Sequence, residues 1–143
     1  MKAFNVVDMQ VARNPVARAI ANKNLSDAVK TFQMRLYMLN EGEDCESDAS
    51  AAMQVLAVVS EALFLTNKEK TPEHQVIRGA MSCLVQIAQR GFKWRTVDAG
   101  SIDAALSRAV DLYKTLNAQT INKAWANVMA TSRRLAAEME VAA

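Results

Sequence analysis

The 143-residue sequence has little of what most catalytic or metal-binding sites require. It contains one histidine, two cysteines, two prolines and four glycines. A structural zinc site needs about four clustered Cys or His ligands, and nucleophilic catalysis needs a base beside a Ser or Cys. The single base candidate, His74, falls at the start of an expected helix, where a solvated side chain is the default. We therefore expect no metal, no cofactor and no enzymatic activity.

The two cysteines indicate a reducing compartment. Cys45 and Cys83 have no spacing that suggests a disulfide framework, and residues 1–10 lack the apolar core of a secretory signal. These features favour a cytoplasmic protein. We expect the carboxylates around Cys45 to raise the pKa of its thiol, and Cys83 to be a buried, inert thiol.

Membrane insertion is not expected either. The most membrane-like stretch, residues 49–67, contains Gln54 and Glu61, and a carboxylate near mid-span costs about 2.5–3.5 kcal/mol on insertion scales. A buried helix of a soluble protein is the better interpretation.

What the sequence does have is helical periodicity. Hydrophobic residues make up 51% of the chain and charged residues 22%, which excludes a disordered chain. Apolar residues recur with a period of 3.6, and strand signals are almost absent. The expected fold is all-α: one domain over residues 1–143, with five substantial helices and a short N-terminal one around a central apolar helix at about 49–66.

Local signals place the helix ends. Asn14-Pro15 and Thr71-Pro72 each combine an N-cap with a proline in the first helical position, and Arg90-Gly91-Phe92 has the order of a Schellman stop. Gly42 is a further candidate helix stop. The expected helices span about 14–24, 25–40, 49–66, 72–90, 101–117 and 120–139, with a flexible arm over 1–13 and a frayed tail at 141–143.

Apolar stripes predict which sides of the first two helices face the core. In the first helix, Val16, Ala19 and Ile20 should point inward. In the second, the stripe contains Leu25, Val29, Phe32 and Leu36, and it is widened by Met34, Tyr37 and Met38.

The net charge of only +2 conceals an uneven distribution, because residues 41–48 form an acidic loop. The chain carries +4 over residues 1–40, −5 over 41–48 and +3 over 49–143. Such bipolar charge suits electrostatic steering toward a charged macromolecule. The loop is either a solvated connector or a site that docks on a basic surface, and its spacing is not that of a calcium-binding EF-hand. Its carboxylates belong to Glu41, Glu43, Asp44, Glu46 and Asp48.

A basic and aromatic segment follows Gly91. It contains Phe92, Lys93, Trp94 and Arg95, residue types that anchor protein interfaces and also stack on nucleic-acid bases. Trp94 is expected either to plug the core between two helices or to be an exposed anchor. Arg133 and Arg134 interrupt the apolar pattern of the last helix on its outer face, where Arg134 can pair with Glu138.

Three functions are compatible with these features. The first is a non-enzymatic protein–protein interaction module that acts stoichiometrically as an adaptor, regulator or inhibitor, and a homodimer through a spare face of the central helix is compatible with it. The second is an accessory nucleic-acid binder that uses Lys93, Trp94, Arg95, Arg133 and Arg134. A helix-turn-helix is disfavoured, because the last helix has a single basic residue in its first two turns. The third, with least support, is an enzyme that works through carboxylates.

Overall fold

The helix α2 (Glu46–Leu65) lies at the centre of the molecule. It packs against each of the other four long helices, and side chains on several of its sides, such as Val55, Leu56 and Val59, are almost fully buried. A helix that is apolar all round must be covered all round. The prediction of an all-α single-domain bundle around a central apolar helix is confirmed, although α2 begins three residues earlier than expected.

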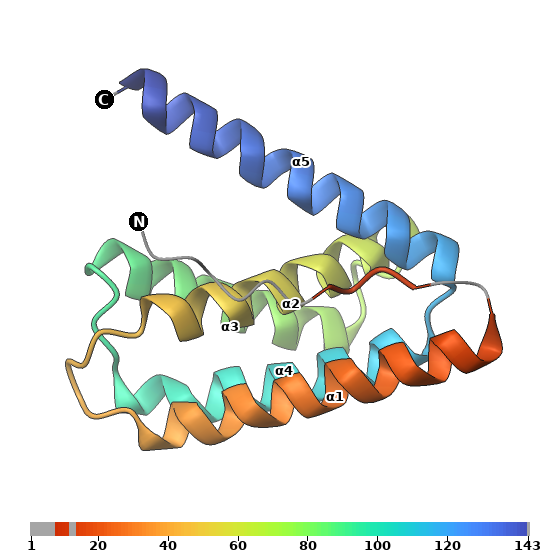
Figure 1. Cartoon of the computed structure of the whole chain (residues 1–143). Helices are drawn as coiled ribbons and strands as arrows, with labels where there is room; N and C mark the ends of the chain where they lie inside the picture. The colour runs from red at the N-terminus through yellow and green to blue at the C-terminus, as the bar shows by residue number, and fades with distance from the viewer. Residues whose placement is uncertain (1–7, 12–13, 143) are drawn as a thin grey trace.

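The computed structural model describes residues 8–11 and 14–142. Besides α2, its elements are α1 (Pro15–Met38), α3 (Pro72–Gln89), the 3-10 turn η1 (Thr96–Asp98), α4 (Ala99–Thr115) and α5 (Ala118–Ala142). Figure 1 shows α1 and α4 side by side, with α2 and α3 in the layer above them. The last helix, α5, crosses α2 near the C-terminal end of α2 and then runs away from the bundle.

The helix ends with the strongest local signals lie where the sequence places them. The side chain of Asn14 accepts hydrogen bonds from the backbone N–H groups of Val16 and Ala17, and that of Thr71 accepts one from His74. At the end of α3, the N–H of Phe92 donates to the carbonyl of Ile87 (3.0 Å), while Gly91 has φ +76°. This is the predicted Schellman stop.

The first two expected helices are one continuous helix, α1, and this reverses the predicted orientation of its first turns. Counting back from the buried Leu25 by four and seven residues gives Ala21 and Arg18, which become the inward positions. Arg18 donates to the carbonyl of Tyr113 and lies over the Tyr113 ring. Val16 and Ile20, expected to point inward, are exposed, as are Met34, Tyr37 and Met38.

Two other boundary predictions are wrong. Residues 8–11 do not form a flexible arm: Met9 and Val11 are buried, and the Asn122 side chain both accepts from the Val11 N–H and donates to the Val11 carbonyl. The rest of the expected arm, residues 1–7 and 12–13, lies outside the described residues. Gly42 has φ +79° but lies in the loop, because α1 already ends at Met38. At the other end, residues 141 and 142 remain helical, and residue 143 is outside the described part.

Within residues 8–11 and 14–142, one helix, α2, is long and apolar enough to cross a membrane. More than half of that stretch is buried inside the bundle. The core helix of a soluble protein shows this pattern, so α2 is weak evidence for a membrane span.

We predict opposite effects of alanine at two glycines. Gly79 lies inside α3 and a Cβ there meets nothing within 4 Å, so Gly79→Ala should raise the free energy of unfolding by about 1 kcal/mol. Gly91→Ala should lower it by about 1 kcal/mol, because its positive φ strains any residue with a Cβ. Urea unfolding followed by circular dichroism measures both changes. A stabilising Gly91→Ala would contradict the left-handed stop.

Candidate functional site

The acidic loop and the basic and aromatic segment pair with each other. The Gly42 N–H donates to the Trp94 carbonyl (2.8 Å), the Trp94 N–H to the Glu43 carbonyl (2.8 Å), and the Cys45 N–H to the Phe92 carbonyl (2.9 Å). These bonds form a short antiparallel bridge between the α1–α2 and α3–η1 connections. The two segments that the sequence offered as separate interaction surfaces are therefore partners within the fold.

The carboxylates of this region also have structural partners. Glu41 accepts from both the N–H and the hydroxyl of Thr96 (2.9 Å each), and these bonds hold the pKa of the Glu41 carboxyl below its usual value. Glu43 accepts from the Asn40 N–H, and Asp44 accepts from the Glu46 N–H. These bonds order the acidic loop within the fold, while Glu41, Glu43 and Asp44 stay exposed, so docking by the loop stays a prediction.

Two of the five acids belong to α2 rather than to a loop. Glu46 is the first residue of α2, and Asp48 is buried in its first turn. The Asp48 carboxylate accepts from the guanidinium of Arg35 on α1 (2.6 Å). The predicted start of α2 at Ala49 is three residues too late. No local pattern indicated that Asp48 is a buried helical residue, because its partner Arg35 lies on another helix.

Trp94 is a core residue, not an exposed anchor. Its side chain is 1% exposed and belongs to the single buried cluster that includes α2 residues. The prediction that Trp94 belongs to an interaction surface is therefore wrong. The alternative prediction, that Trp94 plugs the core, is confirmed. Phe92 is half-buried and lines a groove described below.

The cationic candidates lie on separate elements. Lys93 and Arg95 are exposed in the α3–η1 connection, directly beside the acidic loop. Arg133 and Arg134 are exposed on α5, where Arg134 lies 3.9 Å from Glu138 as predicted. Because Lys93 and Arg95 neighbour carboxylates, they do not form a continuous positive surface of the kind that tracks a phosphate backbone.

Of the two thiols, Cys45 is buried and Cys83, which was expected to be buried, is partly exposed. Cys45 is buried, and its pKa is raised to about 11, mainly by desolvation and then by Asp44 and Asp48. Cys83 is only half-buried on α3. The raised pKa of Cys45 is confirmed, but burial rather than charge is its largest cause, and the buried position expected for Cys83 is wrong.

His74 has a partner that sequence reasoning missed. The expected solvated side chain is 3% exposed. Its Nε2 lies 2.7 Å from the Ser60 hydroxyl, and its Nδ1 lies 2.9 Å from the Glu69 carbonyl. Since the carbonyl can only accept, Nδ1 carries a proton, and in the neutral ring Ser60 donates to Nε2. The premise that the chain offers no nucleophile–base pair is therefore wrong.

This pair lacks the further parts of an acyl-transfer site. Ser60 lies in the middle of α2, where backbone N–H groups are engaged in the helix, and the side-chain amide of Asn127 nearby donates to Glu61. Ser60 shares a hollow with Asn127, Thr131 and Ser132, and the backbone around this hollow belongs to helix interiors, so it offers no free pair of N–H groups of the kind that forms an oxyanion hole. The pair instead satisfies a buried histidine and joins α2 to the start of α3. No group of three His, Cys, Asp or Glu in the described part could hold a metal ion.

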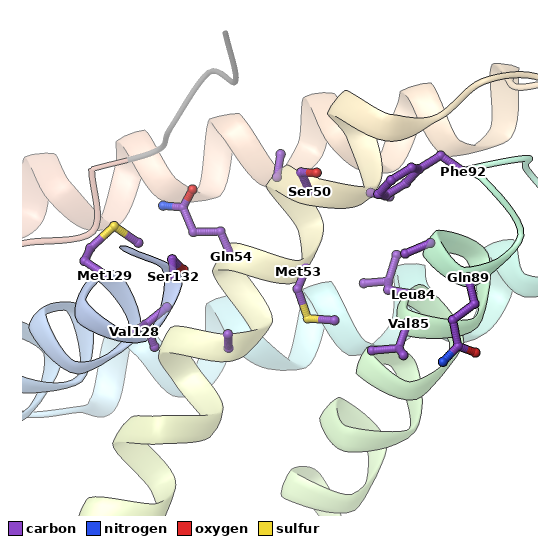
Figure 2. A pocket seen from close by; sticks show the side chains of 14 residues that line it. Ser50, Met53, Gln54, Leu84, Val85, Gln89, Phe92, Val128, Met129 and Ser132 are labelled. Carbon is purple, nitrogen blue, oxygen red and sulfur yellow. The ribbon is translucent and has the colours of Figure 1, made fainter. Parts of the chain in front are cut away.

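An apolar groove of about 680 Å³ lies between α2, α3 and α5. Figure 2 shows Met53 and Leu84 pointing into it, with Phe92 at one end and Val128 at the other. Small alanine side chains line its floor, and the side-chain amides and hydroxyls of glutamine and serine lie at its edges. An apolar centre with a polar rim is the anatomy of a protein interface. The groove is lined by Ala49, Ser50, Ala51, Met53, Gln54, Ala57, Leu84, Val85, Ala88, Gln89, Phe92, Val128, Met129 and Ser132.

The comparisons with known proteins give no help in assigning this groove. No family model, curated protein or solved structure matches the chain. The groove was partly signalled by the sequence, because Val85 and Ala88 lie beside the buried stripe of α3. What the sequence could not show is that α5 leaves this side of α2 uncovered.

We predict that Trp94→Ala destabilises the fold by about 3–5 kcal/mol, because it leaves a large cavity. Trp94→Phe should cost less, since it keeps a ring and removes a buried indole N–H that has no acceptor among the described residues. Chemical unfolding measures both. An unchanged melting temperature for Trp94→Ala would instead make Trp94 a surface residue.

The thiols should differ in reactivity. At pH 8 a thiol with a pKa of about 11 is ionised in roughly one molecule in a thousand, and Cys45 is also buried. We expect Ellman's reagent to label Cys83 in the folded protein, and Cys45 only after denaturant is added. The Cys83→Ser variant should therefore show no rapid labelling. Rapid labelling of that variant would contradict the buried position of Cys45.

Proposed function

We infer that this protein is a non-enzymatic interaction module that seats an amphipathic helix of another protein in the groove between α2, α3 and α5. One observation carries this: the groove of about 680 Å³ is apolar, is walled by helices and has a polar rim. An amphipathic helix that lays its apolar face in such a groove is a recurring mode of recognition. The module would act stoichiometrically, as an adaptor, regulator or inhibitor.

The shape of the groove supports a helical ligand in particular. Packed helix axes lie about 8–10 Å apart, and small side chains at the contact allow the closer distances. Ala49, Ala57 and Ala88 are such positions, while Met53 supplies a flexible apolar side chain that adapts to its partner. Gln89 on the rim is exposed and can hydrogen-bond to polar residues of the incoming helix.

The other interpretations have less support. An enzyme that uses the acidic loop would need carboxylates free for proton transfer, and Glu41 and Asp48 are engaged by Thr96 and Arg35. Nucleic-acid binding would need the exposed arginines to act together, and they lie on separate elements. Cytoplasmic localisation remains a proposal, supported by two cysteines that are both free.

Substitution in the groove tests the proposal. Val85 lines the groove and is 45% exposed, so Val85→Asp should leave the fold intact and weaken capture of a partner from the native cell about tenfold or more. Val16→Asp is the matched control, because Val16 is an exposed valine on α1 outside the groove. Quantitative affinity capture with mass spectrometry measures both.

Two outcomes would overturn the proposal. Equal capture by Val85→Asp and wild type would show that the groove is not the binding site. Salt-sensitive binding of a labelled oligonucleotide, lost in an Arg133→Ala/Arg134→Ala variant, would favour the nucleic-acid interpretation instead.

A further inference from the structure

The two halves of α5 have different environments. In the first half, Ile121 and Ala124 are fully buried, and Val128 packs against the core. In the second half, every described side chain from Ala130 to Val141 is exposed. Figure 1 shows this half diverging from α2 as it leaves the bundle. We refer to residues 130–142 as the distal half of α5.

The distal half of α5 carries an apolar face toward the groove. Leu135 follows Val128 by seven residues, and Met139 follows Ser132 by the same interval. Residues seven apart lie on nearly the same face of a helix, and Val128 and Ser132 both line the groove. Leu135 and Met139 therefore extend the wall that α5 contributes to the groove, although they are 49% and 73% exposed.

The direction of α5 sets which residues of α2 this face would meet. Figure 1 shows α5 running back toward the start of α2, so the two helices are antiparallel, and the side chain of Asn127 donates to Glu61 (3.1 Å). Each step forward along α5 therefore corresponds to one step back along α2. Counted from this hydrogen bond, Leu135 falls opposite Met53, and the next turn of α5 falls opposite Ala49. Both of these α2 residues line the groove.

We propose that the distal half of α5 is a lid of the groove, which closes on α2 and α3 in the free chain and opens to admit the helix of another protein. The proposal rests on the inferred helix-binding role of the groove and names what regulates access to it. The structure shows the open arrangement, in which the apolar face of the lid and the floor of the groove both face solvent. Closure buries both surfaces at once, with Leu135 against Met53.

The tether to the bundle favours the chain's own helix as the resident of the groove. The packed first half of α5 already holds the lid at the groove edge, so closure avoids the loss of translational and rotational freedom that association of two molecules costs. A helix as short as the lid is also marginal in water without packing. Contact with the groove therefore stabilises the helical conformation of the lid itself.

Closure requires a bend in α5, and the residues at the junction suit one. Thr131 and Ser132 stand where the packed half of α5 meets the exposed half. The hydroxyl of a Ser or Thr inside a helix can bond to the carbonyl four residues earlier, and such bonds often bend the helix. Helices also curve gently around a core without a kink. The lack of proline and glycine in residues 118–142 therefore does not prevent closure.

Apolar contact, not charge, would hold the lid closed. The lid carries Arg133, Arg134, Glu138 and Glu140, whose formal charges cancel. Closure thus brings no net charge to the acidic loop beside the groove. Because salt screens attraction between exposed charges but not the burial of apolar surface, we expect closure to depend little on ionic strength.

Disulfide trapping in the free chain tests closure. The pair Ser50→Cys/Met139→Cys joins the groove to the lid, in a Cys83→Ser background that removes the more accessible native thiol. The matched control pair is Ser50→Cys/Ala137→Cys, because Ala137 points to the other side of α5. A disulfide needs Cα atoms within about 7 Å, so we expect the first pair to form it about tenfold or more faster than the control. Non-reducing electrophoresis after mild oxidation measures both rates.

A further substitution shows whether the apolar face drives closure. Adding Leu135→Asp to the first pair should slow disulfide formation about fivefold or more, because it lowers the closed fraction. Adding Val16→Asp, which changes an exposed valine on α1, should leave the rate unchanged. Equal rates for the first pair and its control overturn the proposal. So does a rate that Leu135→Asp leaves unchanged, since a fraying helix end would behave in that way.

A peptide with the sequence of residues 127–142 tests competition for the groove. The full-length lid variant Leu135→Asp/Met139→Asp cannot seat its own lid, so its groove stays open. We expect the fluorescein-labelled peptide to bind this variant about tenfold or more tightly than wild type, because a closed fraction raises the apparent Kd. Adding Val85→Asp should abolish the gain. Fluorescence anisotropy measures binding, and equal affinity for the lid variant and wild type overturns the proposal.

These results are separable from those for the proposed function. The disulfide reports closure in the free chain and needs no partner. Trapping no faster than in the control pair, together with partner capture that Val85→Asp weakens, removes the lid and leaves the interaction module standing. Fast trapping, together with capture that Val85→Asp does not change, leaves closure standing and removes the helix-binding role of the groove.

Discussion

The constraint on which this structure depends is the need to cover α2 on every side. Its side chains, among them Val55, Leu56 and Val59, are almost fully buried, and each contributes about 1.5–3 kcal/mol when removed from water. Four helices are arranged around it to achieve this. Phe64 near the end of α2 stays 60% exposed, and where α5 departs from the bundle the uncovered side of α2 becomes the floor of the groove.

Most of the acidic side chains in the α1–α2 connection lie close to basic residues or hydrogen-bond donors of neighbouring elements. The backbone bridge between residues 42–45 and 92–94 brings the acidic loop against Lys93 and Arg95, and Asp48 is held by Arg35 across α1 and α2. The small net charge is therefore a balance between neighbours in space as well as a sum over the sequence. For this reason the proposed binding site is the apolar groove and not a charged surface.

The exposed C-terminal half of α5 and the groove are two consequences of the same geometry. A straight α5 without proline or glycine diverges from α2, so it carries Leu135 and Met139 into solvent and leaves the groove open between α2, α3 and α5. A helix that packs along its whole length would have neither feature.

The sequence by itself determined the helical fold, the apolar centre and the helix ends that have strong local signals, such as Thr71-Pro72 and Gly91-Phe92. Caps and stops are set by neighbouring residues, so a local pattern is enough to find them. Only the tertiary structure decided that Trp94 is buried, that His74 meets Ser60, and that the groove exists. Each of these features depends on residues that come together from different elements. The apolar periodicity of one helix shows which face is buried, but it does not show which other element packs on that face.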